Sequence, residues 1–397
     1  MDNYRFIIRR GPIQVEFTDI SNAIYFCTAS PEIDIEGEAK GDRVIFKVRL
    51  PDNILNHILV ISELNYTFGF PLEFAKGLSL KTRLELNSSK LKYGGWALNA
   101  SILESEANTI EDLLNLLHEM EIFLHEGTKP NKLKIDFLRS VFEAFKAYNE
   151  SLSWSEFLEG IGKSLGKEEF QILRKAIEEC YSSFYKEYWQ RRRVKLEELS
   201  RKMKKTVDIL QPLKTLEETI GLKFDKEYLE VYPIDVYRIG GGIYAAVSRI
   251  TCGSDPYTVL TIHVDIAHEA GHILMRNWKI EYVDDIRELA SSMNFRIPPT
   301  TPYSYIPSPL MLANTIEEHI AALIQLKVDM KYTGRRRKTH GYIGNPVFKI
   351  AEKAWEETER AYTKFNFKDF IERLLEKVNK SDEAKKTLMT LLRLILN

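Results

Sequence analysis

The stretch HVDIAHEAGHIL, residues 263–274, sets three polar residues at a fixed spacing in an apolar background. His268 and His272 lie four residues apart, and Glu269 directly follows the first of them. Positions i and i+4 of an α-helix lie on one face, about 6 Å apart, so two imidazoles at this spacing can bind one metal ion. The surrounding residues predict that the helix is buried, and burying these polar groups without a partner would be costly; they are Ile262, Val264, Ile266, Ile273 and Leu274.

Zinc is the metal that this pattern indicates. Imidazole nitrogens are common Zn²⁺ ligands. The H-E-x-x-H spacing also places a carboxylate beside the first of the two histidines. Zinc lowers the pKa of a water molecule to about 7, and the neighbouring carboxylate can accept its proton. We therefore predict that His268 and His272 bind Zn²⁺ and that Glu269 is the general base.

A catalytic zinc ion needs a third protein ligand and one open coordination position. The segment NTIEEHIAALIQL predicts a helix that carries Glu317 and Glu318. Glu318 is followed by Ala321 and Ala322, whose small side chains would let this helix approach the HEAGH helix closely. We predict Glu318 as the third ligand, with Glu317 and, in the segment DDIRELASS, Glu288 as the alternatives.

HEAGH, followed about 45 residues later by EEHIAA, resembles the glutamate-zincin superfamily of metallopeptidases. Its members include thermolysin, neprilysin and the oligoendopeptidases. The resemblance covers residues 230–350 and implies a zinc peptidase with Glu318 at the position of the third ligand. Where the neprilysin-type pattern has an aspartate that orients a ligand histidine, this chain has Ala322. A group with that role would have to come from elsewhere in the chain.

Peptide hydrolysis passes through an oxyanion, which a hydrogen-bond donor stabilises. In the resembling families this donor commonly follows the ligand glutamate. The segment THGYIGNP supplies His340 and Tyr342 on a glycine-flanked loop, and we predict these two as the donors. Tyr303 and Tyr305, in TTPYSYIP, are the alternatives.

A glycine-rich segment, GGGIYAAVS, precedes the HEAGH helix. In glutamate-zincins an edge strand at this place binds the substrate backbone by strand addition. The resemblance therefore implies that Gly241 to Val247 form such a strand. A glycine turn that leads into a core strand is the alternative.

The rest of the chain predicts an α+β fold in three parts. Alternating apolar residues in LSLKTRLEL and WALNASI indicate strands, which predicts an antiparallel β domain over residues 1–105. Helical periodicity follows, with Thr109 as a cap and Gly127 as a stop, and predicts a helical domain over 106–222. Residues 223–397 are expected to form a zincin-like catalytic domain, mostly helical with a small β-sheet.

The amino-acid composition bears on the binding partners and the cellular location that can be expected for the protein. The 397 residues include 56 basic and 57 acidic side chains, a balance that gives no reason to expect nucleic acid or a membrane as partner. No apolar run reaches the roughly 20 residues of a spanning helix. The N-terminus has no apolar core of a secretory signal, and three dispersed cysteines fit a reducing compartment, so a cytoplasmic location is expected.

These observations predict a cytoplasmic zinc metallopeptidase that acts on oligopeptides. An exopeptidase is the alternative among enzymes, and it would need a charged anchor for one substrate terminus. A non-catalytic scaffold that retains a zincin fold is the alternative of another class. The presence of Glu269 favours the enzyme, because a scaffold has no need of a general base.

Overall fold

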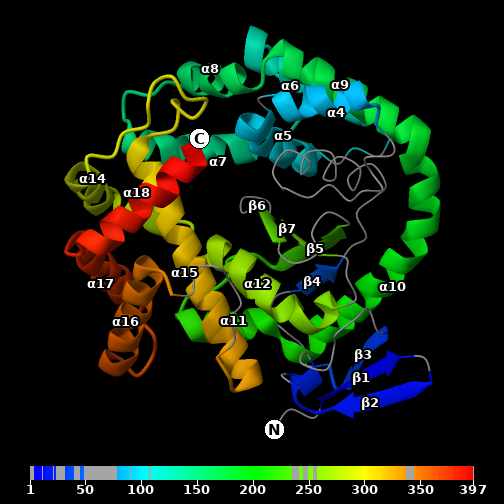
Figure 1. Cartoon of the computed structure of the whole chain (residues 1–397), viewed down its shortest axis with the longest axis vertical. Coiled ribbons are helices and arrows are strands. Elements are labelled where there is room, and N and C mark those ends of the chain that lie inside the picture. The colour runs from blue at the N-terminus through cyan, green and yellow to red at the C-terminus, as the bar shows by residue number, and fades with distance from the viewer. Residues whose placement is uncertain are drawn as a thin grey trace.

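The fold is mixed α+β and mostly helical, as predicted (Figure 1). The computed structural model describes residues 4–10, 12–20, 22–23, 32–39, 45–48, 78–89, 91–105, 107, 109–234, 241–244, 249–253, 257–336 and 344–396.

Three N-terminal strands form an antiparallel sheet of order β2-β1-β3. Phe6 lies opposite Ile35 and Ile8 lies opposite Ile33. All four side chains are buried, which fixes the register because a slip of one residue would turn this apolar set outward. The strands are β1 (Tyr4–Arg10), β2 (Ile13–Phe17) and β3 (Glu32–Gly37).

A second sheet joins the N-terminal part of the chain to the part that carries HEAGH. Its order is β4-β5-β7-β6. Strand β4 pairs in parallel with β5, β5 pairs in parallel with β7, and β6 is antiparallel to β7 at one edge. The predicted N-terminal antiparallel region thus supplies a parallel strand to a sheet built mainly from later residues. The strands are β4 (Ile45–Val48), β5 (Tyr228–Ile234), β6 (Gly241–Tyr244) and β7 (Arg249–Gly253).

The strand predicted in LSLKTRLEL is wrong, because residues Leu80–Ser88 form helix α4. The Ser79 side chain accepts a hydrogen bond from the Thr82 backbone N–H at 3.2 Å and so caps the helix. Leucine, lysine, arginine and glutamate are also strong helix formers. Leu80 and Leu84, which the alternation places on one face of a strand, are 64% and 59% exposed on this helix.

The strand predicted in WALNASI is also wrong, because residues Leu91–Ser105 form helix α5. The alternation of apolar residues did not indicate a strand here, because α5 is buried on several sides. Ala97, Leu98 and Ala100 are all inaccessible or nearly so. A Cβ atom on Gly94 would lie 2.6 Å from Leu165 Cγ, so a glycine is required where α5 meets the end of α8.

The predicted helical region is confirmed. Thr109 and Asp112 form a capping box at the start of α6, and Gly127, with φ 69°, ends it. Helices α9 and α10 are joined through a π-helical segment, Tyr181–Tyr185, and α10 runs along one side of the molecule in Figure 1. The helices are α6 (Ile110–Glu126), α7 (Asp136–Tyr148), α8 (Trp154–Ser164), α9 (Lys167–Cys180), α10 (Lys186–Leu210) and α11 (Pro212–Ile220).

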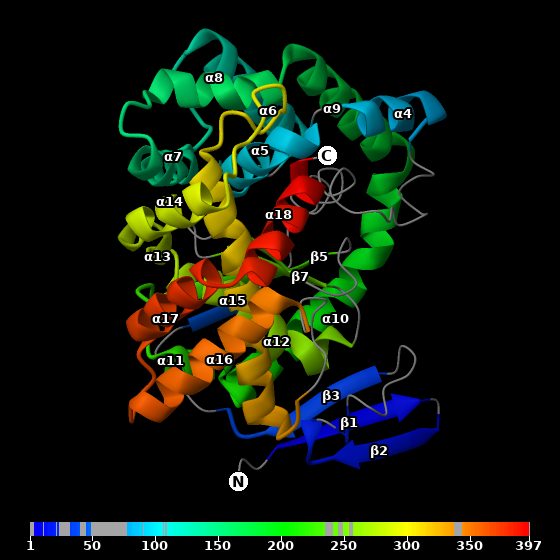
Figure 2. The same ribbon diagram turned by 60° about the vertical axis from the view of Figure 1, so that its left-hand side comes forward.

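The C-terminal part is helical, as predicted. Helix α12 contacts β6 and β7 as well as α10, α11 and α15, and it packs most extensively on α15. Figure 2 shows α17 on one side of α15 and α10 on the other. The helices are α12 (Thr258–Leu274), α13 (Trp278–Glu281), α14 (Val283–Ser292), α15 (Ser308–Thr333), α16 (Pro346–Ala361), α17 (Phe367–Asn379) and α18 (Asp382–Leu396).

One cluster of buried apolar side chains extends from β1 to α18. The parts of the chain therefore share a core. Within the residues that the structure describes, no helix has the length and apolar character that a membrane span requires.

Candidate metal centre

Helix α12 carries His268, Glu269 and His272 in the interior of the protein. Their exposures are 9%, 5% and 8%, which confirms that this helix is buried on nearly all sides. The rings of His268 and His272 have centroids 5.0 Å apart. Two buried imidazoles and a carboxylate are thus held together by the packing of one helix.

Helix α15 brings Glu318 to both imidazoles. Glu318 Oε2 lies 3.7 Å from His268 Nε2, and Glu318 Oε1 lies 3.7 Å from His272 Nε2. One ligand atom from each of the three residues lies within 4.8 Å of the other two. The small residues after Glu318 are buried, Ala321 at 0% and Ala322 at 1% exposure, where α15 packs along α12.

This arrangement fits a small divalent cation. Two ligands bound about 2 Å from one ion at a tetrahedral angle are separated by roughly 3.4 Å, close to the observed 3.7 Å. Both imidazoles present Nε2, and two imidazoles with one carboxylate form a ligand set typical of catalytic zinc. The Glu318 side chain is 47% exposed, against 11% and 9% for the two histidines. The group therefore opens on the side of Glu318, where a catalytic site needs room for water and substrate.

Glu317 lies behind His272 and orients it. Its Oε1 accepts a hydrogen bond from His272 Nδ1 at 2.7 Å. Its Oε2 accepts one from Trp278 Nε1 at 3.0 Å and pairs with Lys279 Nζ at 2.8 Å. A proton fixed on Nδ1 leaves the Nε2 lone pair for a metal ion. Glu317, weighed as an alternative ligand, is thus engaged at the opposite nitrogen of the ring.

The charges of this network shift the pKa of both partners. Burial lowers the pKa of His272, but the hydrogen bond and charge of Glu317, with Glu318 and Glu269, outweigh it and raise the pKa to about 9. Burial raises the pKa of Glu317, but Lys279 and His272 outweigh it and lower the pKa to about 2. In the metal-free chain the pair is therefore an ion pair at neutral pH.

Two further carboxyls on α12 are buried with the histidines. Burial raises the pKa of Glu269, and Glu318 adds to this, while His268 and His272 oppose it. Asp265, one turn earlier, has its pKa raised to about 7 by burial and by the charge of Glu269. Glu269 therefore holds a proton more readily than an ordinary glutamate, as a general base near neutral pH should.

The remaining predicted ligand does not reach the group. Glu288 is exposed on α14, and its Oε1 accepts a hydrogen bond from Asn379 Nδ2 at 3.3 Å. His319, beside Glu318, is structural: its Nδ1 donates to the Thr315 carbonyl at 2.8 Å, and its Nε2 meets Asn345 Nδ2 at 2.8 Å.

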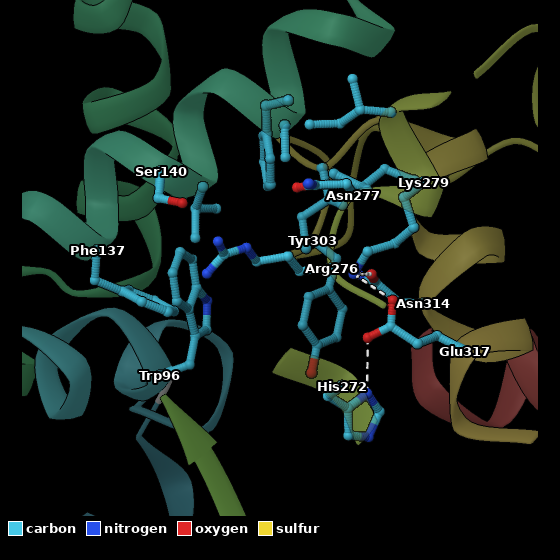
Figure 3. Close-up of a pocket in the computed structure, with 16 residues that line it drawn as sticks. Trp96, Phe137, Ser140, His272, Arg276, Asn277, Lys279, Tyr303, Asn314 and Glu317 are labelled. Atoms are coloured by element: carbon cyan, nitrogen blue, oxygen red, sulfur yellow. Dashed lines mark hydrogen bonds and ion pairs between the residues drawn. The ribbon is translucent and has the colours of Figure 1, made fainter. Parts of the chain in front are cut away.

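The predicted oxyanion donors His340 and Tyr342 lie outside the described residues. The alternatives Tyr303 and Tyr305 differ in position. The Tyr305 hydroxyl accepts a hydrogen bond from Trp96 Nε1 at 3.2 Å, and the ring stacks on Phe145. In Figure 3 the hydroxyl end of Tyr303 points toward His272. Of these two alternatives, Tyr303 is therefore the one that faces a proposed ligand, while Tyr305 packs between helices.

Among the described residues, strand β6 lies at the edge of the second sheet, as the resemblance implied for its segment. It occupies one end of the second sheet, antiparallel to β7, and contacts α12. Its described residues are Gly241–Tyr244, and residues 245–248 lie outside the described ranges.

Lys279 and Trp278 are the site residues that sequence reasoning missed. Neither residue was assigned a role in the site from the sequence. A signal was available in the adjacent acidic pair Glu317 and Glu318. Neighbouring helical residues point about 100° apart, so one carboxylate can face the Nε2 atoms while the other faces Nδ1.

Comparisons of the chain with family models, with curated proteins and with solved structures found no match.

Proposed function

We propose that this protein is a zinc-dependent peptidase that hydrolyses peptide bonds in oligopeptides. The observation that carries the proposal is the convergence of His268, His272 and Glu318 beside the buried carboxylate of Glu269. Zinc bound to these three residues would supply the positive charge that acidifies water and stabilises an oxyanion.

Glu269 is the proton carrier in this proposal. It follows a ligand histidine on the same buried helix, and its raised pKa favours taking a proton from water. The same carboxyl then returns the proton to the leaving amine. The hydrogen bonds of Glu317 to His272 and Trp278 hold the ligand ring in place during these steps.

Two other elements would bind the substrate. Strand β6 is at the end of the described sheet, and an extended peptide paired with it would have its backbone aligned beside α12. The hydroxyl end of Tyr303 points toward His272 (Figure 3), which supports Tyr303 as the hydrogen-bond donor to the oxyanion. His340 and Tyr342 remain predictions from the sequence for the same role.

We propose the cytosol as the location and peptides as the partners. Cys180 is a buried free thiol, which fits a reducing compartment. The near-balance of charge supports neither nucleic acid nor a membrane surface as a partner. An exopeptidase stays the alternative, and the positions at which peptides are cut distinguish it from an endopeptidase.

Zinc content and peptide cleavage test the proposal together. The purified chain is analysed for bound metal and incubated with a mixed peptide library, with Glu269→Gln beside it. We expect about one zinc ion per chain in both forms and cleavage lower by about 10²- to 10⁴-fold in the variant, because glutamine cannot accept the proton.

Glu288→Gln is the matched control, because Glu288 is an exposed glutamate away from the metal centre. This variant should leave both the zinc content and the peptide cleavage unchanged. A chain that binds no zinc would refute the metal centre. Zinc in wild type without cleavage of any peptide would refute the peptidase and favour the scaffold.

A further inference from the structure

A cavity of about 470 Å³ lies beside the metal centre, between α5, α7, the segment from α12 to α13 and the start of α15. Figure 3 shows the side chains that line it. Much of its wall is apolar, and this apolar wall comes from segments far apart in the sequence: Trp96, Phe137, Val141, Phe145, Ile306 and Leu310.

The cavity borders the candidate metal centre at one residue, His272. His272, a proposed ligand, and Glu317, which orients it, both line it. Tyr303 lines it too, with its hydroxyl end toward His272 (Figure 3). A group in this cavity would therefore lie against the imidazole of His272, one of the three proposed ligands.

The polar groups at this end of the cavity are largely engaged with one another. Lys279 Nζ pairs with Glu317 Oε2 at 2.8 Å and donates to Asn314 Oδ1 at 2.9 Å. Arg276, also in the wall, forms an ion pair with Asp225. With these charges compensated, what the cavity offers a ligand is chiefly apolar and aromatic surface.

We propose that this cavity is the subsite that selects peptides with an aromatic or large aliphatic residue beside the scissile bond. The inference rests on the proposed peptidase function. A volume of this size can accept one large side chain with part of its backbone. Burying such a side chain should favour it over alanine by on the order of 10- to 100-fold in kcat/KM.

The test uses a peptide series with Ala, Leu, Phe or Trp on either side of one bond. Wild type should cleave the large apolar members at least about tenfold faster than the alanine member at one of the two positions. Ala144→Phe fills the cavity from α7. It should lower kcat/KM for the Phe peptide at least about tenfold and leave that for the Ala peptide within about twofold.

Two further variants guard against misfolding. Ala361→Phe makes the same change at an exposed residue of α16 outside the cavity and should change nothing. Ser140→Trp fills the cavity from an exposed position that a bulky residue can occupy without entering the core, and it should act like Ala144→Phe. Zinc content, measured in each variant, should stay at the wild-type level.

The outcomes separate the two proposals. If wild type cleaves peptides without preference for large residues, the subsite inference is wrong and the peptidase stands. The subsite inference is also wrong, and the peptidase also stands, if filling the cavity slows cleavage of the Ala and Phe peptides equally. If wild type binds zinc but cleaves no peptide, both proposals are overturned.

Discussion

Glu317→Gln should weaken zinc binding by an amount that depends on pH. The wild-type carboxylate has two opposing effects on His272. It accepts the Nδ1 hydrogen bond at 2.7 Å that orients the ring, and together with Glu318 and Glu269 it raises the pKa of the metal-free imidazole to about 9. The first effect favours the metal, while the second favours a competing proton.

The magnitudes follow from these two effects. Loss of an orienting partner costs about 10- to 100-fold in metal affinity. At about pH 7 the wild-type imidazole is about two pH units below its pKa of 9, so a proton competes with zinc by roughly 100-fold. Glutamine lowers that pKa and removes much of the competition. We therefore expect a loss of about 10- to 100-fold at about pH 9 that nearly vanishes at about pH 7.

Competition with a chromogenic chelator measures the zinc affinity at each pH, with Glu288→Gln as the control. In wild type the affinity should rise about tenfold per pH unit between about pH 7 and 9, because the His272 proton must leave. The variant should show a shallower slope. If the variant lost the same zinc affinity at both pH values, competition between zinc and the His272 proton would be refuted. If it lost no zinc affinity at about pH 9, the orienting role of Glu317 would be refuted.

Three further predictions test other parts of the structure. Glu318→Gln should abolish stoichiometric zinc binding, measured by metal analysis, and leave the thermal unfolding of the metal-free chain nearly unchanged, because this side chain is 47% exposed; full retention of zinc would exclude Glu318 as the third ligand. Tyr303→Phe should lower kcat by about 10²- to 10³-fold at similar KM, whereas Tyr305→Phe should chiefly cost about 1 kcal/mol of stability through the lost bond to Trp96; equal kinetics of the two variants would contradict these assignments. Ser79→Ala should destabilise the protein by about 1 kcal/mol in denaturant unfolding, because it removes the cap of α4. An unchanged unfolding midpoint would contradict the role of Ser79 as the cap of this helix.

The convergence of the histidines and glutamates could be predicted because its information is local. His268, Glu269 and His272 lie on one helix, and helical spacing alone places their side chains together. The small residues Ala321 and Ala322 indicated where α15 could approach, and the structure places Glu318 there. The long helices were predictable for the same reason, since their caps and periodicity are contained within each segment.

The wrong strand predictions and the missed site residues concern features that depend on tertiary contacts, which no single segment of the sequence contains. Alternation in α4 and α5 resembled strands because the sequence does not show which leucines stay exposed or that α5 is buried on several sides. The roles of Lys279 and Trp278 depend on how the chain turns after α12, which brings α13 against Glu317. The cavity is formed by residues from α5, α7 and α15, whose meeting is a property of the tertiary fold.

The uneven exposure of the three proposed ligands bears on how fast the metal can exchange. The imidazoles are fixed on a buried helix, and Glu318 is the partly open member of the group. An ion could therefore enter or leave when one glutamate side chain rotates, while α12 and α15 stay packed together. Loading the protein with zinc would then be quick compared with unfolding. A chain stripped by a chelator should regain its metal without refolding.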